Sequence, residues 1–169
     1  MVLPQAEPIR SAHGLSVNIG EQVYTSPRVR RAGVETTTAC QIKVEFTKVD
    51  IKNDTDTDPP WPFPDNPGEI RLTLTVESVP QYWPSSIGSE SIKTGNSKTF
   101  SKVFNVSNNR SDPLNISVHA QDVGDDPDDM GTVTASHSGS LPTNFGAGNK
   151  SLENAFFKIY YTVTVTEPP

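Results

Sequence analysis

Residues 69–76 read EIRLTLTV, a stretch in which four aliphatic side chains alternate with polar ones. The same period of two returns at residues 157–165, FKIYYTVTV, where every second side chain is Phe, Ile, Tyr or Val. Successive side chains of a β-strand point to opposite faces, so this period is typical of strands with one buried face. Both stretches predict β-strands, and their Val and Thr content agrees, because β-branched side chains fit a pleated surface.

Further stretches with this period predict the remaining strands, at residues 40–51, 99–107 and 114–120, with a short strand starting near Thr132. No stretch has the 3.6-residue period of a helix, and SLENAFF near residue 151 is expected to form a single turn. Fifteen prolines and eleven glycines argue against a helical bundle. A parallel sheet would need helical crossovers. The sequence therefore predicts an all-β fold, an antiparallel β-sandwich of about eight strands.

Residues 1–38 lack a sustained period and are interpreted as an N-terminal arm or extra strands, while residues 39–169 form the predicted sandwich domain. The arm holds a basic cluster, Arg28, Arg30 and Arg31, which is too short to predict a nucleic-acid partner. The chain starts without the basic-then-apolar order of a secretory signal. It also lacks a run of roughly 18 to 20 apolar residues that would predict a membrane span.

The net charge of -6 is concentrated in two short segments, residues 54–65 and 122–129. These segments hold nine carboxylates and no Lys or Arg, whereas the rest of the chain carries fourteen basic and eleven acidic side chains. The nine are Asp54, Asp56, Asp58, Asp65, Asp122, Asp125, Asp126, Asp128 and Asp129. Because each segment separates two predicted strands, both segments are expected to be loops.

Three strands, at 69–78, 99–107 and 114–120, are expected between the two acidic loops. This odd number is taken to place both loops at one end of the sandwich, where loops gather. Like charges about 4 Å apart repel by on the order of 1 kcal/mol per pair in water, and by more at lower dielectric. A divalent cation relieves this repulsion. Oxygen ligands presented irregularly by two loops select Ca²⁺, which takes about six to eight oxygens, so the sequence predicts a calcium site.

Magnesium, zinc and an EF-hand each fit the acidic segments less well. Mg²⁺ prefers fewer carboxylates and more water, and Zn²⁺ would need His and Cys, of which the chain has three and one. The run Asp54, Asp56, Asp58 resembles an EF-hand loop, but its sixth position is Pro59 instead of Gly and no helix flanks it. The alternative without a metal is a pair of solvated loops that only aid solubility.

The second acidic loop carries a more specific pattern. C2-type calcium-binding domains typically read D-x-D-x5-D-x-x-G at this place. Asp122, Asp128 and Gly131 stand at the last three of these positions, and Ala120 stands at the first. Over about residues 39–166 the chain thus resembles a C2 domain, an eight-stranded antiparallel sandwich with acidic loops at one end.

The resemblance extends to the first acidic loop, which ends DNPGEIRLTLTV and looks like the C2 segment in which an Asp, here Asp65, precedes the next strand. The resemblance implies that Asp65, Asp122 and Asp128 are the main Ca²⁺ ligands. The other six aspartates form the pool that supplies the remaining ligands.

Two aromatic pairs lie between the predicted strands. Trp61 and Phe63 fall inside the first acidic loop, in PPWPFP, where proline keeps the backbone extended. They are expected to bind a membrane, glycan or protein surface, the alternative being that they cap the sandwich end. Tyr82 and Trp83 are placed in a second loop and are expected to pack.

The sequence shows no G-x-S-x-G nucleophile motif and no phosphate-binding glycine-rich loop, so a non-enzymatic role is predicted. The predicted function is a calcium-binding module whose acidic loops engage a membrane, glycan or protein surface. The alternative is a structural or adhesive subunit that forms a homo-oligomer through the N-terminal arm, with calcium only stabilising loops. Calcium use favours an extracellular or surface location, and the compartment is otherwise open.

Overall fold

The chain is described by a computed structural model, which covers residues 18–19, 22–23, 39–55, 67–124 and 127–167. It divides into two units, Met1–Thr36 and Thr37–Pro169. In the smaller unit the described residues form one antiparallel pair, β1 (Asn18–Ile19) with β2 (Gln22–Val23). The rest of the predicted arm lies outside the described residues.

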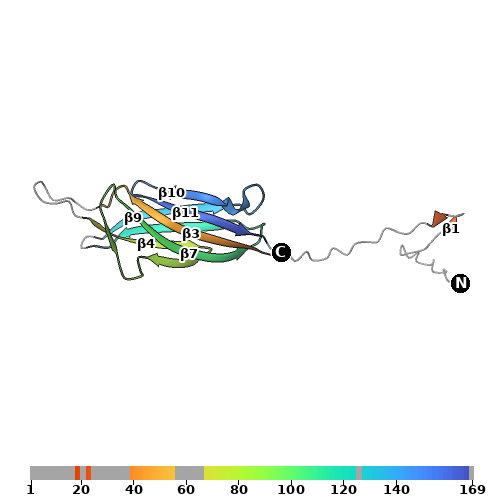
Figure 1. Cartoon of the computed structure of the whole chain (residues 1–169), viewed down its shortest axis with the longest axis horizontal. Coiled ribbons are helices and arrows are strands. Elements are labelled where there is room, and N and C mark those ends of the chain that lie inside the picture. Colours follow the sequence, from red (N-terminus) through yellow and green to blue (C-terminus); the bar gives the residue numbers. More distant parts are fainter. Residues whose placement is uncertain (1–17, 20–21, 24–38, 56–66, 125–126, 168–169) are drawn as a thin grey trace, which may run out of the picture. The chain divides into compact units, whose positions relative to one another are not determined.

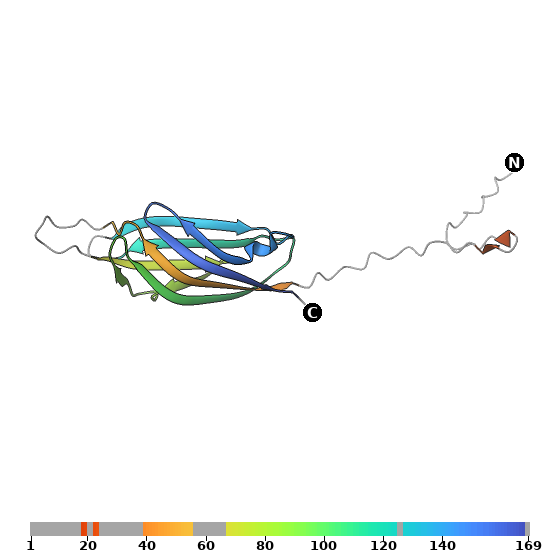
Figure 2. The same ribbon diagram turned by 45° about the horizontal axis from the view of Figure 1, so that its top comes forward.

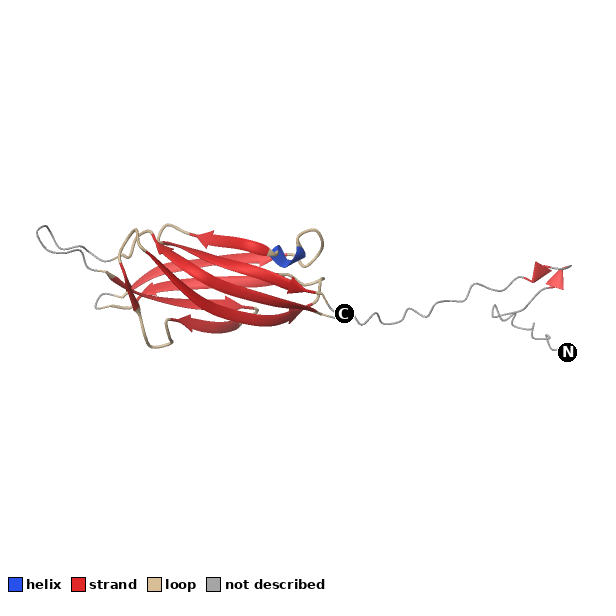
Figure 3. Cartoon of the chain, in the orientation of Figure 1, coloured by secondary structure: helices blue, strands red, loops and turns tan. Residues whose placement is uncertain are grey.

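The larger unit is a sandwich of two antiparallel sheets, confirming the predicted fold class (Figures 1 and 3). The first sheet has the order β10 (Gly148–Glu153), β11 (Phe157–Thr166), β3 (Cys40–Ile51), β7 (Ser97–Asn108). The second has the order β5 (Val79–Trp83), β4 (Gly68–Val76), β8 (Leu114–Asp122), β9 (Asp128–His137), with β6 (Glu90–Ile92) also on β4. The only helix in the described part is the 3₁₀ turn Asn144–Gly146, and no described helix is long and apolar enough to cross a membrane.

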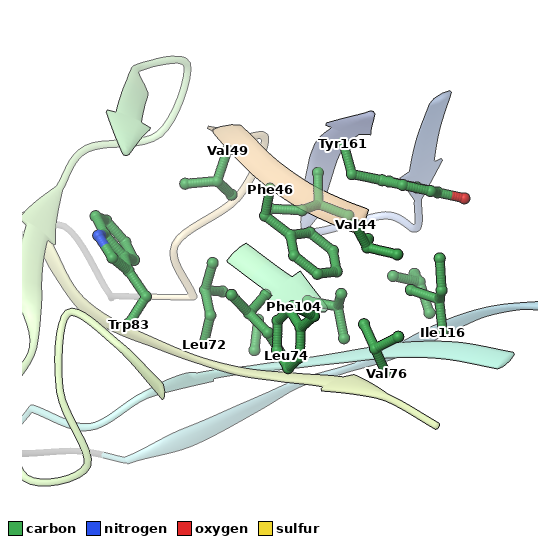
Figure 4. Packing of buried hydrophobic residues seen from close by; sticks show 14 of the residues in the cluster. Val44, Phe46, Val49, Leu72, Leu74, Val76, Trp83, Phe104, Ile116 and Tyr161 are labelled. Carbon is green, nitrogen blue, oxygen red and sulfur yellow. The ribbon is translucent and has the colours of Figure 1, made fainter. Parts of the chain in front are cut away.

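The core lies between the two sheets and is built from the alternating strands. In β4 every second residue from Gly68 to Val76 is buried, as the period of two requires. Figure 4 shows side chains of both sheets meeting in this layer, among them Phe46 and Leu74. Phe46 is fully buried, and its ring lies 5.8 Å from that of Phe104 and 5.6 Å from that of Tyr161. Aromatic packing of this kind adds stabilisation beyond the area that it buries.

Three local predictions need correction. Tyr82 and Trp83 belong to strand β5 and not to a loop, although Trp83 does pack, being 8% exposed and stacked on Phe100 at 4.6 Å. The predicted turn near residue 151 is instead strand β10, which pairs with β11 along its whole length. Strand β9 starts at Asp128, four residues before the predicted start. In each case a neighbouring strand supplies hydrogen bonds that the local pattern does not reveal.

The edge of the second sheet beside β4 is shared by two short strands. β5 pairs with the later part of β4, at Leu72 to Val76, and β6 pairs with its beginning, at Gly68 to Ile70. Both run antiparallel to β4, so together they occupy one strand position. The nine strands of the described sandwich therefore fill eight positions, in agreement with the predicted number.

A polar contact joins the two sheets between His137 on β9 and Tyr161 on β11, whose Nε2 and Oη atoms are 2.9 Å apart. Burial raises the pKa of Tyr161 to about 12, so its phenol stays protonated at neutral pH. Burial also lowers the pKa of the half-buried His137, and the nearby Lys150 adds to this effect. His137 is therefore more easily protonated in the unfolded chain than in the folded one.

We expect the free energy of unfolding to fall as the pH drops below about 6.5, because the unfolded chain then takes up a proton at His137 that the folded chain resists. Urea unfolding at pH 7.5 and pH 5.5 measures this difference. The variant His137→Gln cannot titrate and should lose less stability between the two pH values than the wild type. An equal loss in both proteins would contradict the assignment.

Candidate metal centre at the acidic end

The segments that border the two acidic loops adjoin because β4 pairs with β8. In this antiparallel pair Ile70, near the start of β4, lies opposite Asp122, the last residue of β8. Just beyond, the backbone N–H of Val123 donates to the carbonyl of Glu69 at 2.9 Å. The segment that enters β4 and the segment that leaves β8 therefore adjoin. They lie at the end of the sandwich where β3 stops, which we call the acidic end (Figure 2).

The route between the loops differs from the predicted one. The prediction counted three strands between the loops and placed both loops at one end, which was wrong, because three crossings of the sandwich bring the chain to the opposite end. The edge position shared by β5 and β6 supplies a fourth crossing, in addition to β4, β7 and β8. The segments that border the two loops do converge, but through an edge strand that the sequence pattern did not reveal.

Asp122 is a buried carboxylate with one satisfied and one unsatisfied oxygen. Its residue is 1% exposed. Oδ1 accepts hydrogen bonds from the backbone N–H groups of Glu69 at 3.0 Å and Gly124 at 3.1 Å. Oδ2 is buried and accepts no hydrogen bond from any described residue. A buried carboxylate oxygen without a partner carries a large desolvation cost, so this atom points to a missing positive ligand.

Asp54, the first residue of the acidic segment 54–65, is held by a third loop. It is 5% exposed, and Thr94, between β6 and β7, clamps its carboxylate. Oδ2 accepts from the Thr94 backbone N–H at 2.9 Å, and Oδ1 accepts from the Thr94 hydroxyl at 3.0 Å. The Asp54 backbone N–H donates to the same hydroxyl at 3.0 Å. The carboxylate is therefore fixed in one orientation while it keeps lone pairs for a cation.

Gly68 lies between these two acids and lets them approach. A Cβ atom added at Gly68 would lie 2.7 Å from Cβ of Asp54 and 2.9 Å from Oδ2 of Asp122. The side chains of Asp54 and Asp122 therefore border the same small space. Glycine is required at position 68 because a larger side chain would overlap both Asp54 and Asp122.

Of the remaining candidate ligands, two lie within the described residues and five lie outside them. Asp128 lies opposite Asp122 in the pairing of β8 with β9, and its side chain is exposed. Asp129 has other partners: its Oδ1 accepts from the Gly131 N–H at 2.7 Å and lies 2.8 Å from Nε2 of His119. The hydrogen bond to His119 and then that of Gly131 lower the pKa of the Asp129 carboxyl, so it stays ionised. The predicted residues outside the described ranges are Asp56, Asp58, Asp65, Asp125, Asp126, Trp61 and Phe63.

The described donors fit a hard cation, although they do not complete its shell. Within residues 39–55, 67–124 and 127–167, no three His, Cys, Asp or Glu side chains are grouped as a metal site. Two buried acids border Gly68, Asp54 with its Cβ atom and Asp122 with Oδ2 of its carboxylate. Carboxylate oxygens suit Ca²⁺ better than Zn²⁺. These two acids are compatible with a hard cation, but they do not by themselves form a metal site within the described residues.

Thr94 and Gly68 were missed by the sequence analysis. Gly68 directly precedes the alternating stretch 69–76, and this position of a glycine at the entrance of a strand was an available signal for close approach. Thr94 follows β6, which has only three residues and is too short to be predicted from a period of two. Its contact with Asp54 spans forty positions of the chain and follows from the tertiary structure.

Solved structures share this fold at low sequence identity. Human GIVD cytosolic phospholipase A2, in complex with a fluorophosphonate inhibitor and terbium chloride, matches with a TM-score of 0.51 and 10% identity over 78% of this chain and 18% of its own. The two C2 domains of extended-synaptotagmin 2, calcium bound, match with a TM-score of 0.50 and 10% identity, over 76% of this chain and 46% of theirs. This chain spans less than half of either structure. No protein-family model and no curated protein matches it.

The larger unit therefore has a C2-like fold, which confirms the resemblance seen in the sequence. At this level of identity the likeness establishes the arrangement of strands and leaves the function to be argued from the site.

We expect the substitution Gly68→Ala to lower the free energy of unfolding by about 1–3 kcal/mol, because the added methyl group overlaps Asp54 and Asp122. Thermal or urea unfolding measures the loss. Gly124→Ala is the matched control, since its Cβ would meet Asp122 and Glu69 at 3.4 Å, where small adjustments suffice. Equal stability of the Gly68→Ala variant and the wild type would show that the two acids do not share this space.

Proposed function

We propose that this C2-like module binds Ca²⁺ at its acidic end and uses the bound ion to attach to an anionic membrane surface. The observation that carries the proposal is the pair of buried carboxylates beside Gly68, one of which, Asp122, has an oxygen with no hydrogen-bond donor in the described structure. Two buried negative charges that border one space repel each other, and a divalent cation converts this repulsion into attraction.

Calcium would be held by Asp54 and Asp122 together with ligands from the acidic loops. We keep the predicted pool for this role: Asp56, Asp58, Asp65, Asp125, Asp126, Asp128 and Asp129. Ala120 stands at the position of one aspartate in the C2 pattern and is fully buried, so it cannot supply a ligand. We therefore assign more importance to Asp54, which Thr94 holds in place. Backbone carbonyls and water would complete a shell of about six to eight oxygens.

The membrane is proposed as the partner because of how charge is arranged. Without an ion, the concentrated carboxylates of the acidic end repel anionic lipid head groups. With Ca²⁺ bound, the ion can share its oxygen shell between the protein and a lipid phosphate or carboxylate. Trp61 and Phe63, within the first acidic loop, are the residues that we expect to enter the interface, where aromatic rings are favoured.

The role is proposed to be non-enzymatic. The buried acids at the acidic end are held by hydrogen bonds from Thr94 and from the backbone, an arrangement that suits ion binding. The two histidines among the described residues are engaged in contacts of their own, His137 on β9 with Tyr161 and His119 on β8 with Asp129. The alternative of a structural or adhesive subunit depends on residues 1–38, most of which lie outside the described ranges.

We expect Ca²⁺ to raise the melting temperature. A ligand at a hundred times its Kd adds about 2.7 kcal/mol to the free energy of unfolding. Differential scanning calorimetry with millimolar Ca²⁺ or EGTA measures the shift. Asp122→Asn should abolish most of it, because this variant removes the buried carboxylate whose Oδ2 has no described hydrogen-bond partner.

The matched control is Asp112→Asn, which removes an exposed carboxylate from the loop between β7 and β8, at the other end of the sandwich. This variant should keep the full response to calcium. The calcium proposal fails if the wild type melts alike with Ca²⁺ and EGTA, or if the two variants respond equally.

We expect the protein to sediment with phosphatidylserine-containing vesicles when Ca²⁺ is present and to stay in solution with EGTA or with pure phosphatidylcholine. Trp61→Ala and Phe63→Ala should weaken sedimentation while the calcium-induced rise in melting temperature persists. Calcium binding without any lipid dependence would refute the membrane partner and leave the ion site standing.

A further inference from the structure

A second recognition surface lies on the outer face of the sheet formed by β5, β4, β8 and β9. A groove of about 400 Å³ opens there, a volume within the range of small-molecule sites. It is lined by Thr75, Ser78, Asn115, Ile116, Ser117, Thr134, Ala135 and Ser136. Six of these eight residues carry a hydroxyl or an amide, and none is charged. The groove therefore combines uncharged polar side chains with a larger share of apolar surface.

Strand register arranges these polar groups in rows. Thr75 on β4 pairs with Ser117 on β8, which in turn pairs with Thr134 on β9. Because neighbouring strands lie about 4.8 Å apart, the three hydroxyl side chains form a line of roughly 10 Å across the sheet. Asn115 and Ser136 form the next pair along the strands, on the same face. The paired strands already fix the backbone of these rows, so no conformational entropy of the backbone is lost there when a ligand binds.

The hydroxyl groups of this groove have no hydrogen-bond partner among the described residues. Those of Thr75, Ser117, Thr134 and Ser136 make no hydrogen bond within the described structure, and each can donate one and accept two. Near the rim, the Glu77 carboxylate accepts from the backbone N–H of Asn115 at 2.6 Å. The lining thus offers free donors and acceptors without a charge of its own, and one carboxylate lies near its rim.

An aromatic side chain stands beside the groove on the same face. Tyr82 on β5 pairs with Thr73, which lies two residues before Thr75 on β4 and also points outward. Tyr82 is 39% exposed. An exposed aromatic ring presents an apolar face to the C–H groups of a sugar ring while its hydroxyl remains available for hydrogen bonds.

We infer that this groove binds a neutral glycan. Sugar rings present many hydroxyl groups and apolar C–H faces without charge, and they complement free side-chain hydroxyls next to an aromatic ring. Anionic ligands lack a cationic partner in the lining, and lipids or apolar peptides would leave these polar groups without hydrogen bonds. The site is separate from the acidic end and does not depend on calcium.

Affinity electrophoresis through gels that contain a neutral β-glucan or a neutral mannan tests this inference. The full chain is run in EGTA, so that failure of the calcium proposal cannot affect the result. We expect at least one neutral polysaccharide to retard the protein. Dextran sulfate, an anionic polysaccharide, should not retard it. Absence of retardation in both neutral gels, or retardation by dextran sulfate alone, would overturn the inference.

Variants locate the binding site. Ser117→Asp places a charge in the centre of the hydroxyl row and should raise the Kd for the retarding polysaccharide by about tenfold or more. Thr164→Asp is the matched control and should bind like the wild type. Thr164 is exposed and lies in the other sheet, on β11, where it pairs with Lys43 on β3.

Two smaller changes, Ser117→Ala and Tyr82→Ala, keep the inference testable if the aspartate in β8 disturbs folding. Both should weaken retardation while the melting temperature stays near that of the wild type. Binding that is unchanged in Ser117→Ala and Tyr82→Ala, or that falls equally in Thr164→Asp, would overturn the assignment to this groove.

Discussion

The antiparallel pairing of β4 with β8 is the constraint on which the candidate site depends. It sets Asp122 opposite Ile70, so the carboxylate at the end of β8 can accept the N–H groups of Glu69 and Gly124. The same pairing holds Gly68 between Asp122 and Asp54. A shift of one residue would turn the outward face of β4 into the core, so burial of the apolar face fixes this register firmly.

This register leaves one buried carboxylate oxygen that no described residue satisfies. Thr94 and backbone N–H groups orient the buried acids, yet Oδ2 of Asp122 has no donor in the described structure. Folded proteins rarely retain such atoms without a reason, because burying an unpaired charge is costly. The hydrophobic core between the sheets offsets the cost, and the proposed ion binding explains why this unpaired oxygen persists.

Much of the sandwich could be predicted from the sequence, because strands with one buried face show it through their period of two. This holds for β3, β4, β7, β8 and β11. It fails for β5 and β6, since Val79–Trp83 and Glu90–Ile92 are short edge strands whose partners lie on β4. That omission mattered for the site: without the edge position, a correct count of crossings would have placed the acidic loops at opposite ends, and the predicted shared end depended on a wrong parity rule.

Composition and spacing by themselves determined that the chain is an all-β sandwich with its negative charge gathered in two loops, and that its second loop resembles that of a C2 domain. Tertiary structure alone decided which acids are buried together, because the contact of Asp54 with Thr94 and the space at Gly68 depend on strands far apart in the chain. It also aligned the hydroxyl groups of three strands into one groove. Periodicity is a local property that any window of sequence displays, whereas a site is formed by residues that only folding makes neighbours.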